Sequence, residues 1–167
     1  MCKLSNVLLS ALLPFAFNPL AYAAETPVKV KVPLTVGSFD LTAAKVIGSG
    51  EKKGGVYTAK EIKVKVDDMT TGQPLRDKHT KEHLESAKYP FITVSDIKAS
   101  GGSGTAKITV KGITKEIKFI YKDAGPGKAT ADFKLNLKDF KFSGISYLGV
   151  GVEDEVQVTA TLPYSGS

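Results

Sequence analysis

Tryptophan is absent from this 167-residue chain, and its one cysteine, Cys2, directly follows the first methionine. Without a second cysteine the chain cannot form an internal disulfide, so its stability must come from buried apolar surface and hydrogen bonds. The chain also has no G-x-S-x-G sequence, no phosphate-cradling loop and no cysteine nucleophile beyond residue 2. These absences argue against an enzyme, and we expect no cofactor.

Arginine is nearly absent, although the chain is basic. There are 23 lysine and arginine residues against 17 acidic residues, and Arg76 is the only arginine. Proteins that bind nucleic acids usually gather arginine and aromatic side chains on one patch, whereas these lysines alternate along extended segments. We therefore expect a solvated lysine-rich face and no nucleic-acid partner. A weak contact with anionic membrane surfaces is compatible with the net charge of +6.

Long apolar runs are missing beyond the N-terminus, and the run found there is short. It begins after Lys3, is interrupted by Pro14 and Pro19, and ends in the small-residue sequence AYA. This order is typical of a secretory signal peptide and not of a transmembrane anchor. We predict a signal peptide at residues 1–23 and a single domain at residues 24–167, which is exported to the periplasm.

Strict alternation of apolar and polar residues recurs along the rest of the chain. Segments with one apolar and one polar face are typical of half-buried antiparallel strands. SFDLTAAKVI and YPFITVSDI add two further strand candidates, and glycine-rich turns such as SGGSG and DAGPGK separate the segments. Six segments show the alternation clearly: VKVKV, EIKVKV, AKITV, EIKFIY, DFKLNLK and EVQVTATL.

Short connections between neighbouring strands imply hairpins, and hence a meander of about eight antiparallel strands. Such a meander can form a sandwich or a closed barrel. We favour the barrel because closure removes the exposed sheet edges, and an eight-stranded barrel can hold one small ligand. The chain lacks the aromatic girdles of an outer-membrane barrel, so we place the lysines outside and the apolar face inside. Many inward residues are small or medium-sized, which leaves room for an alkyl chain.

The segment between Pro74 and Pro90 has no alternation and contains good helix formers. We predict a short helix near residues 75–88, on a connection that lies across one mouth of the barrel as a plug or a lid. This helix carries both histidines in the spelling H-x-x-E-H, which places His79 and His83 on one face. A catalytic zinc site would need a third protein ligand and a cleft, so we expect no metal and regard the pair as weak candidates only.

Three motifs follow one another along the chain: Thr71-Gly72 followed by Arg76-Asp77-x-His79, then Lys88-Tyr89-Pro90, and then KGITKEIKF at residues 111–119. In this order they resemble the YceI-like family of bacterial periplasmic lipid-binding proteins. A weaker similarity to the family covers the last two predicted strands, at residues 132–162.

The resemblance implies an extended, lipocalin-like barrel of eight antiparallel strands whose lumen holds a polyisoprenoid or a fatty-acid derivative. Arg76 and Tyr89 would then lie near the polar end of the ligand, although Arg76 and Asp77 also fit a purely structural ion pair. The alternative is a barrel filled by its own side chains that acts as a stress or interaction module. Whether the barrel binds a lipid or is filled by its own side chains, we expect the protein to be a monomer or a homodimer. We predict these ligand-binding residues in the lumen and at the mouth: Val64, Val66, Arg76, Tyr89, Phe91, Ile108, Val110, Ile117, Phe119, Tyr121, Phe133, Leu135, Val156 and Val158.

Overall fold

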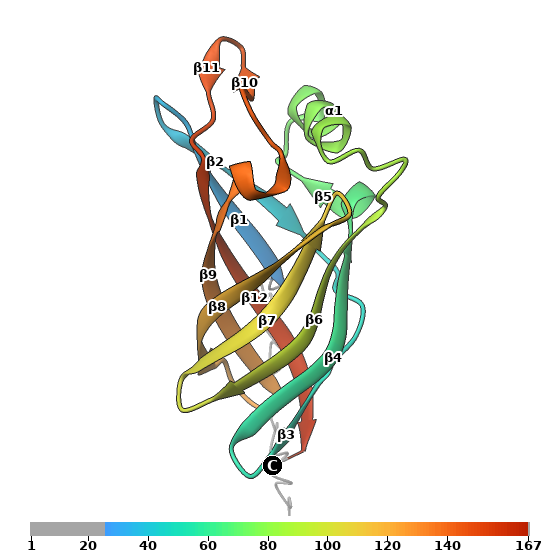
Figure 1. Cartoon of the computed structure of the whole chain (residues 1–167), viewed down its shortest axis with the longest axis vertical. Coiled ribbons are helices and arrows are strands. Elements are labelled where there is room, and N and C mark those ends of the chain that lie inside the picture. The colour runs from blue at the N-terminus through green and yellow to red at the C-terminus, as the bar shows by residue number, and fades with distance from the viewer. Residues whose placement is uncertain (1–25, 167) are drawn as a thin grey trace, which may run out of the picture.

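The computed structural model describes residues 26–166, so the predicted signal peptide lies outside the described residues. The chain forms a tall barrel with one short helix, α1, at one end and strand β3 at the other (Figure 1); we call these the α1 end and the β3 end. The strands are β1 (Val28–Pro33), β2 (Ser38–Ala43), β3 (Gly50–Lys53), β4 (Val56–Lys65), β5 (Met69–Thr70), β6 (Phe91–Ser100), β7 (Ser103–Val110), β8 (Ile113–Asp123), β9 (Lys128–Asn136), β10 (Ser146–Tyr147), β11 (Val150–Gly151) and β12 (Glu155–Gly166). The helices are α1 (Pro74–His83) and two 3-10 turns, η1 (Val66–Asp68) and η2 (Leu137–Phe140).

The barrel closes through the last strand. Seven strands form a ring in the order β3-β4-β6-β7-β8-β9-β12, and β12 completes it by pairing in parallel with β3. Nearer the α1 end the neighbour of β12 is β1, which continues the sheet to β2 and β5. Between β2 and β3, Ile47 and Lys63 of β4 exchange two backbone hydrogen bonds of 2.8 Å each. β2 and β3 therefore act as one bent strand. Together with β1, β4, β6, β7, β8, β9 and β12 it makes a wall of eight strands, and the predicted barrel is confirmed.

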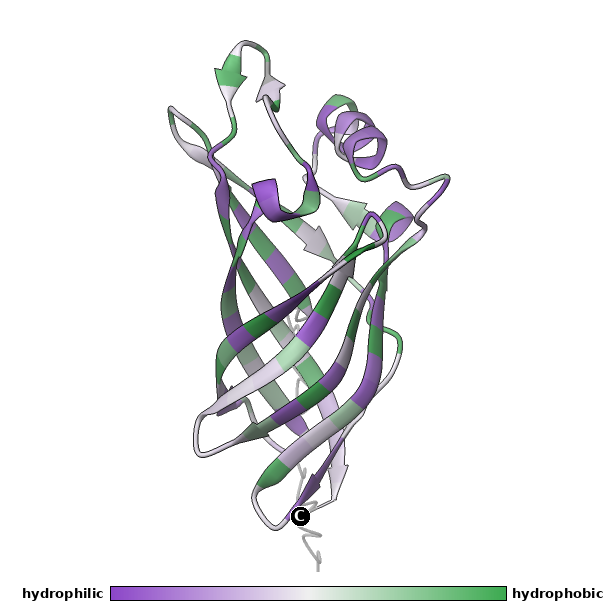
Figure 2. Cartoon of the chain, in the orientation of Figure 1, coloured by the Kyte–Doolittle hydropathy of each residue, from purple (hydrophilic) through white to green (hydrophobic). Residues whose placement is uncertain are grey.

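Alternation along the strands decides which side chains face the interior. In β8, Ile117 and Phe119 are buried, whereas Lys118 between them is exposed, as is Ile120 with 65% of its surface accessible. Figure 2 shows the same alternation of hydrophilic and hydrophobic positions along the strands. Burying one such side chain stabilises the fold by about 1.5–3 kcal/mol. A strand shifted by one residue would turn all its buried side chains to the outside, so the alternation fixes the register of the wall.

Three hairpins turn within two residues, and both residues of each turn have positive φ. The turns are Gly54-Gly55, Gly101-Gly102 and Lys111-Gly112. Two-residue turns of this conformation match the twist of antiparallel strands, and glycine adopts positive φ at little cost. The glycine-rich sequences therefore set both the positions of these turns and the registers of the strands that follow them.

Side chains from η2 and from the segment after α1 fill the α1 end. Phe140 and Phe142 are buried in a cluster with residues of β6, β7 and β8, and Leu84 packs against the same cluster. The helix α1 itself buries none of its residues. The prediction of a short helix at one end of the barrel is confirmed, although the helix ends at His83 and not near residue 88. Because α1 buries no side chain, the interior at this end is filled by Leu84, Phe140 and Phe142 instead.

Asp77 organises the turn that leads into α1. One carboxylate oxygen accepts hydrogen bonds from the backbone N–H and the hydroxyl of Thr71, both at 2.6 Å. The other accepts a hydrogen bond of 2.6 Å from the Thr70 hydroxyl. Burial acts to raise the pKa of Asp77, but the hydrogen bonds outweigh it and hold the pKa below its ordinary value. Asp77 is thus a structural residue that ties the helix to β5.

Replacement of Gly48 tests the bend between β2 and β3. Gly48 has a φ of +108°, and a Cβ there would lie 2.6 Å from the Glu61 carbonyl oxygen. Gly37 has a similar φ of +86° but open space around it. We expect Gly48→Ala to lower the free energy of unfolding by about 1–3 kcal/mol more than Gly37→Ala, because only Gly48→Ala adds a steric clash. Urea denaturation followed by circular dichroism measures both, and equal losses would contradict a close approach at Gly48.

Candidate functional site

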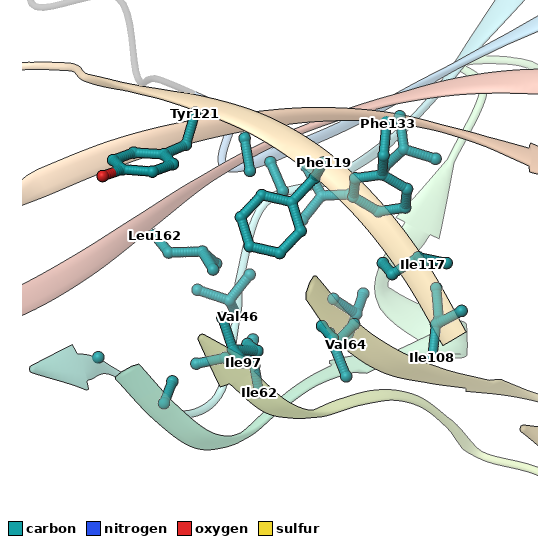
Figure 3. Close-up of a pocket in the computed structure, with 18 of the residues that line it drawn as sticks. Val46, Ile62, Val64, Ile97, Ile108, Ile117, Phe119, Tyr121, Phe133 and Leu162 are labelled. Atoms are coloured by element: carbon teal, nitrogen blue, oxygen red, sulfur yellow. The ribbon is translucent and has the colours of Figure 1, made fainter. Parts of the chain in front are cut away.

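The barrel encloses an apolar cavity, part of which is drawn in Figure 3. Its atom-free volume is about 1190 Å³, a figure that includes the open space at its mouth. Apart from Thr58 and three tyrosines, every side chain in its lining is apolar. The cavity can therefore bind hydrocarbon but offers polar contacts at few places.

The cavity exists because short side chains line several neighbouring strands of the barrel wall. Ala131 of β9 and Ala160 of β12 are direct cross-strand partners, and both line the cavity and keep part of their surface accessible. Ala59, Ala99 and Ala106 line it from three other strands. An eight-stranded barrel is just wide enough for long side chains to fill its centre, so alanines at these positions leave the centre open.

Most of the predicted ligand-binding residues lie in this lining. They come from β4, β7, β8, β9 and β12, which supply the wall along most of its length. In Figure 3 the rings of Phe119 and Phe133 point into the space between the sheet walls. The predicted residues that line the cavity are Val64, Ile108, Val110, Ile117, Phe119, Tyr121, Phe133, Leu135 and Val158.

Three predicted residues on or near strands lie outside the lining. Val66 is buried in the 3-10 turn η1, where the alternation of β4 ends. Val156 is buried in a second core cluster with residues of β1 and β2, so neighbouring side chains already fill the space around it. Phe91 is the first residue of β6 and is 38% exposed, because it lies where the strand begins.

The two predicted mouth residues, Arg76 and Tyr89, also lie away from the cavity. The guanidinium of Arg76 lies over the ring of Phe39, 4.5 Å from its centroid. Tyr89 packs on the turn between β7 and β8, where a Cβ on Gly112 would lie 2.9 Å from its ring. Both residues therefore pack against other segments of the α1 end and do not line the cavity.

A polar cluster that sequence reasoning missed lies at the β3 end. Its members are Lys52, Tyr57, Asp123 and Tyr164, and we call them the mouth cluster. Tyr57 and Tyr164 line the cavity, and both of their hydroxyls donate hydrogen bonds to one oxygen of Asp123, from Tyr164 at 3.3 Å. The Lys52 ammonium is 3.7 Å from the other oxygen and 4.8 Å from the centroid of the Tyr57 ring.

The aromatic rings hold the mouth cluster together. Tyr57 makes edge-to-face contacts with Tyr121 and Tyr164, at centroid separations of 5.0 and 4.9 Å. Such contacts fix ring orientation as well as adding stability. One signal in the sequence indicates part of the cluster: Asp123 continues the inward series of Ile117, Phe119 and Tyr121.

The members of the mouth cluster shift one another's pKa values. Burial is the main cause that raises the pKa of Tyr57 to about 12, and the hydrogen bond to Asp123 adds to it. The same hydrogen bond, together with the Lys52 ammonium, holds the pKa of Asp123 below its ordinary value. A hydrogen bond with Tyr57 raises the pKa of Lys52. Near neutral pH the cluster therefore contains the Lys52 cation, the Asp123 anion and a protonated Tyr57 hydroxyl.

Both histidines of the H-x-x-E-H sequence lie on α1, His79 half-buried and His83 exposed. Within residues 26–166, no three histidine, cysteine, aspartate or glutamate side chains are arranged so that they could hold a metal ion. In the same part of the chain, no helix combines the length and the hydropathy needed to cross a membrane.

A closed sheet around an apolar interior places the protein in the lipocalin-like class of β-barrels. The YceI-like domain family matches residues 22–164, so the chain belongs to the YceI-like family, as its sequence motifs indicate. A comparison with curated proteins gave no match.

Solved structures support the assignment of the fold. BcnA from Burkholderia cenocepacia is 18% identical with a TM-score of 0.62, over 81% of this chain and 94% of that one. A polyisoprenoid binding domain from Saccharophagus degradans is 13% identical with a TM-score of 0.59, over 81% of this chain and 90% of that domain. The YCEI protein of Campylobacter jejuni is 16% identical with a TM-score of 0.56, over 92% and 98%. At these identities the likeness shows a shared fold.

Titration of Tyr57 tests the mouth cluster. Because its folded-state pKa of about 12 exceeds the ordinary value of 10.0, the stability that its hydrogen bond confers is complete below pH 10 and is lost as the pH rises through 12. We expect Asp123→Asn to lower the pKa of Tyr57, since the negative charge that disfavours tyrosinate is removed. Carbon-13 NMR of the tyrosine Cζ measures both proteins, and an unchanged pKa would show that Asp123 does not contact Tyr57 in solution.

Proposed function

We propose that this protein binds a long-chain lipid or isoprenoid in the barrel cavity and carries it, without catalysing a reaction, in the periplasm. The observation that carries the proposal is the apolar cavity, which is lined by alanine and branched aliphatic side chains along much of its wall. Membership of the YceI-like family and the likeness to a polyisoprenoid binding domain support it. Export to the periplasm rests on the signal peptide predicted from residues 1–23.

Burial of an alkyl chain in this cavity is sufficient for useful affinity. Each buried methylene contributes about 0.8 kcal/mol, so sixteen contribute about 13 kcal/mol. An association cost of about 5 kcal/mol leaves about 8 kcal/mol, which corresponds to a dissociation constant near 1 μM. Such a ligand would be released by partition into a membrane or another protein, with no chemical step. The open centre supports a carrier over the alternative of a barrel filled by its own side chains.

Purification from a bacterial periplasm without detergent tests this function directly. Native mass spectrometry should show the protein with a bound mass of a few hundred daltons, and organic extraction should release a fatty-acyl or isoprenoid species. A protein that arrives empty, and stays empty after incubation with such lipids, would contradict the proposal and favour the interaction module.

Filling part of the cavity should weaken binding. The double variant Ala131→Leu, Ala160→Leu adds two neighbouring side chains at one level of the lumen. We expect its affinity for the fluorescent fatty acid cis-parinaric acid to fall at least tenfold, with an unchanged or higher melting temperature because the added groups occupy empty space.

The matched control for this variant is Lys118→Leu, which adds a leucine on the outer face of β8. It should bind cis-parinaric acid like the wild type. Unchanged binding by the double variant would place the lipid outside the cavity.

A further inference from the structure

The cavity has one polar end. Its tyrosines, Tyr57, Tyr121 and Tyr164, gather with Lys52 and Asp123 at the β3 end. At the other end the interior is filled by Leu84, Phe140 and Phe142, which offer no polar side-chain atom. Burying a polar group without hydrogen bonds costs several kcal/mol, so the head group of an amphiphile must lie where partners are available. In this barrel the partners are in the mouth cluster.

The Lys52 ammonium has three N–H donors, and its hydrogen bond with Tyr57 uses only one of them. Its ammonium is 3.7 Å from the nearest Asp123 oxygen, beyond the usual hydrogen-bond range of about 2.7–3.2 Å. It lies over two rings that line the cavity, 4.8 Å from the centroid of Tyr57 and 5.5 Å from that of Tyr164. Its side chain is only 24% exposed. A cation held between two cavity-lining rings is placed to meet an acceptor at the end of a bound chain.

Asp123 is placed less well to recognise a ligand. One of its oxygens already accepts hydrogen bonds from Tyr57 and Tyr164, and the other faces the Lys52 ammonium. Its side chain is 57% exposed, so water can replace the tyrosine hydroxyls if these turn toward a ligand. A cationic head group would therefore compete with three existing partners, whereas an anionic one can accept from the Lys52 ammonium directly and from the tyrosine hydroxyls once these turn away from Asp123.

The net charge at the β3 end also favours an anionic head group. The two segments that carry Lys52, Tyr57 and Asp123, residues 50–57 and 121–128, contain four lysines and two acidic residues, a net charge of +2. An anion approaching this end is attracted, and a cation is repelled.

We propose that the mouth cluster binds the carboxylate of a long-chain carboxylic acid, with the alkyl chain extending into the cavity toward the α1 end. This assignment rests on the proposed function and adds the ligand's head group and its direction. The carboxylate accepts hydrogen bonds from the Lys52 ammonium and from the hydroxyls of Tyr57 and Tyr164. Near-complete burial of the chain supplies the affinity, and Lys52 selects the acid.

Three ligands with the same chain and different head groups test the assignment: dodecanoic acid, 1-dodecanol and dodecylamine. Each is measured at pH 7.5 by its displacement of the fluorescent probe 1-aminoanthracene from the whole protein. We expect the acid to bind at least tenfold more tightly than the alcohol, and the amine most weakly. Without a cationic partner the order of acid and alcohol would reverse, since a carboxylate loses more hydration on burial than a hydroxyl does.

Variants of two adjacent lysines separate recognition from bulk charge. Lys52→Met should lose the preference for the acid while its affinity for the alcohol is kept, which also shows that the variant is folded. Lys53→Met removes the same charge at an exposed position of β3 and should keep the preference, as should Lys52→Arg. A preference for the amine, or an acid preference that survives Lys52→Met, would overturn the head-group assignment and leave lipid binding intact. If none of the three ligands displaces the probe from the wild type, the proposed function fails as well.

Discussion

The pairing of β12 with its neighbours is the constraint on which the rest of the structure depends. One strand of twelve residues pairs with β9 along most of its length, with β1 near the α1 end and with β3 at the other end. This arrangement removes the sheet edges on both sides of β12 and encloses the interior. The two sections of the barrel wall that meet at β12 also differ in the side chains that they carry. Val28 and Leu41 pack the section formed by β1 and β2, whereas the section next to β3 carries the mouth cluster.

Much of the wall was predictable from the sequence, because a half-buried strand repeats every two residues and this chain keeps that repeat over long segments. Nine of the fourteen predicted ligand-binding residues line the cavity for this reason. The prediction was limited where the repeat ends or changes phase. Val66 lies where β4 gives way to a turn, and Phe91 lies where β6 begins. In β4 the adjacent Lys60 and Glu61 are both exposed, so extending the EIKVKV alternation backward places Tyr57 on the wrong face.

Two of the three motifs that identify the family mark a different part of the molecule from the cavity, whereas the third, at residues 111–119, carries Ile117 and Phe119 of the lining. Asp77 holds Thr70 and Thr71, Arg76 lies over Phe39, and Tyr89 packs on the turn at Gly112. The Asp77 contacts are local, whereas the contacts of Arg76 and Tyr89 join segments far apart in sequence at the α1 end, where the interior must be sealed. Short polar motifs with fixed spacing therefore report on how the barrel is closed at one end. The chemistry of the lumen depends instead on side-chain size, which alternation alone does not reveal, and on the loop-proximal residues of the β3 end.

The parallel contact between β12 and β3 also has a consequence for how the chain folds. The two partners, Tyr164 and Gly50, are separated by more than a hundred residues, and β12 is the last strand of the chain. The local hairpins can form early, but the ring cannot close until β12 finds both β1 and β3. Until then, the inward-facing valines and isoleucines of an open sheet are exposed to water. Closure is thus a late, long-range event, and the interval before it is when the chain is most prone to aggregate.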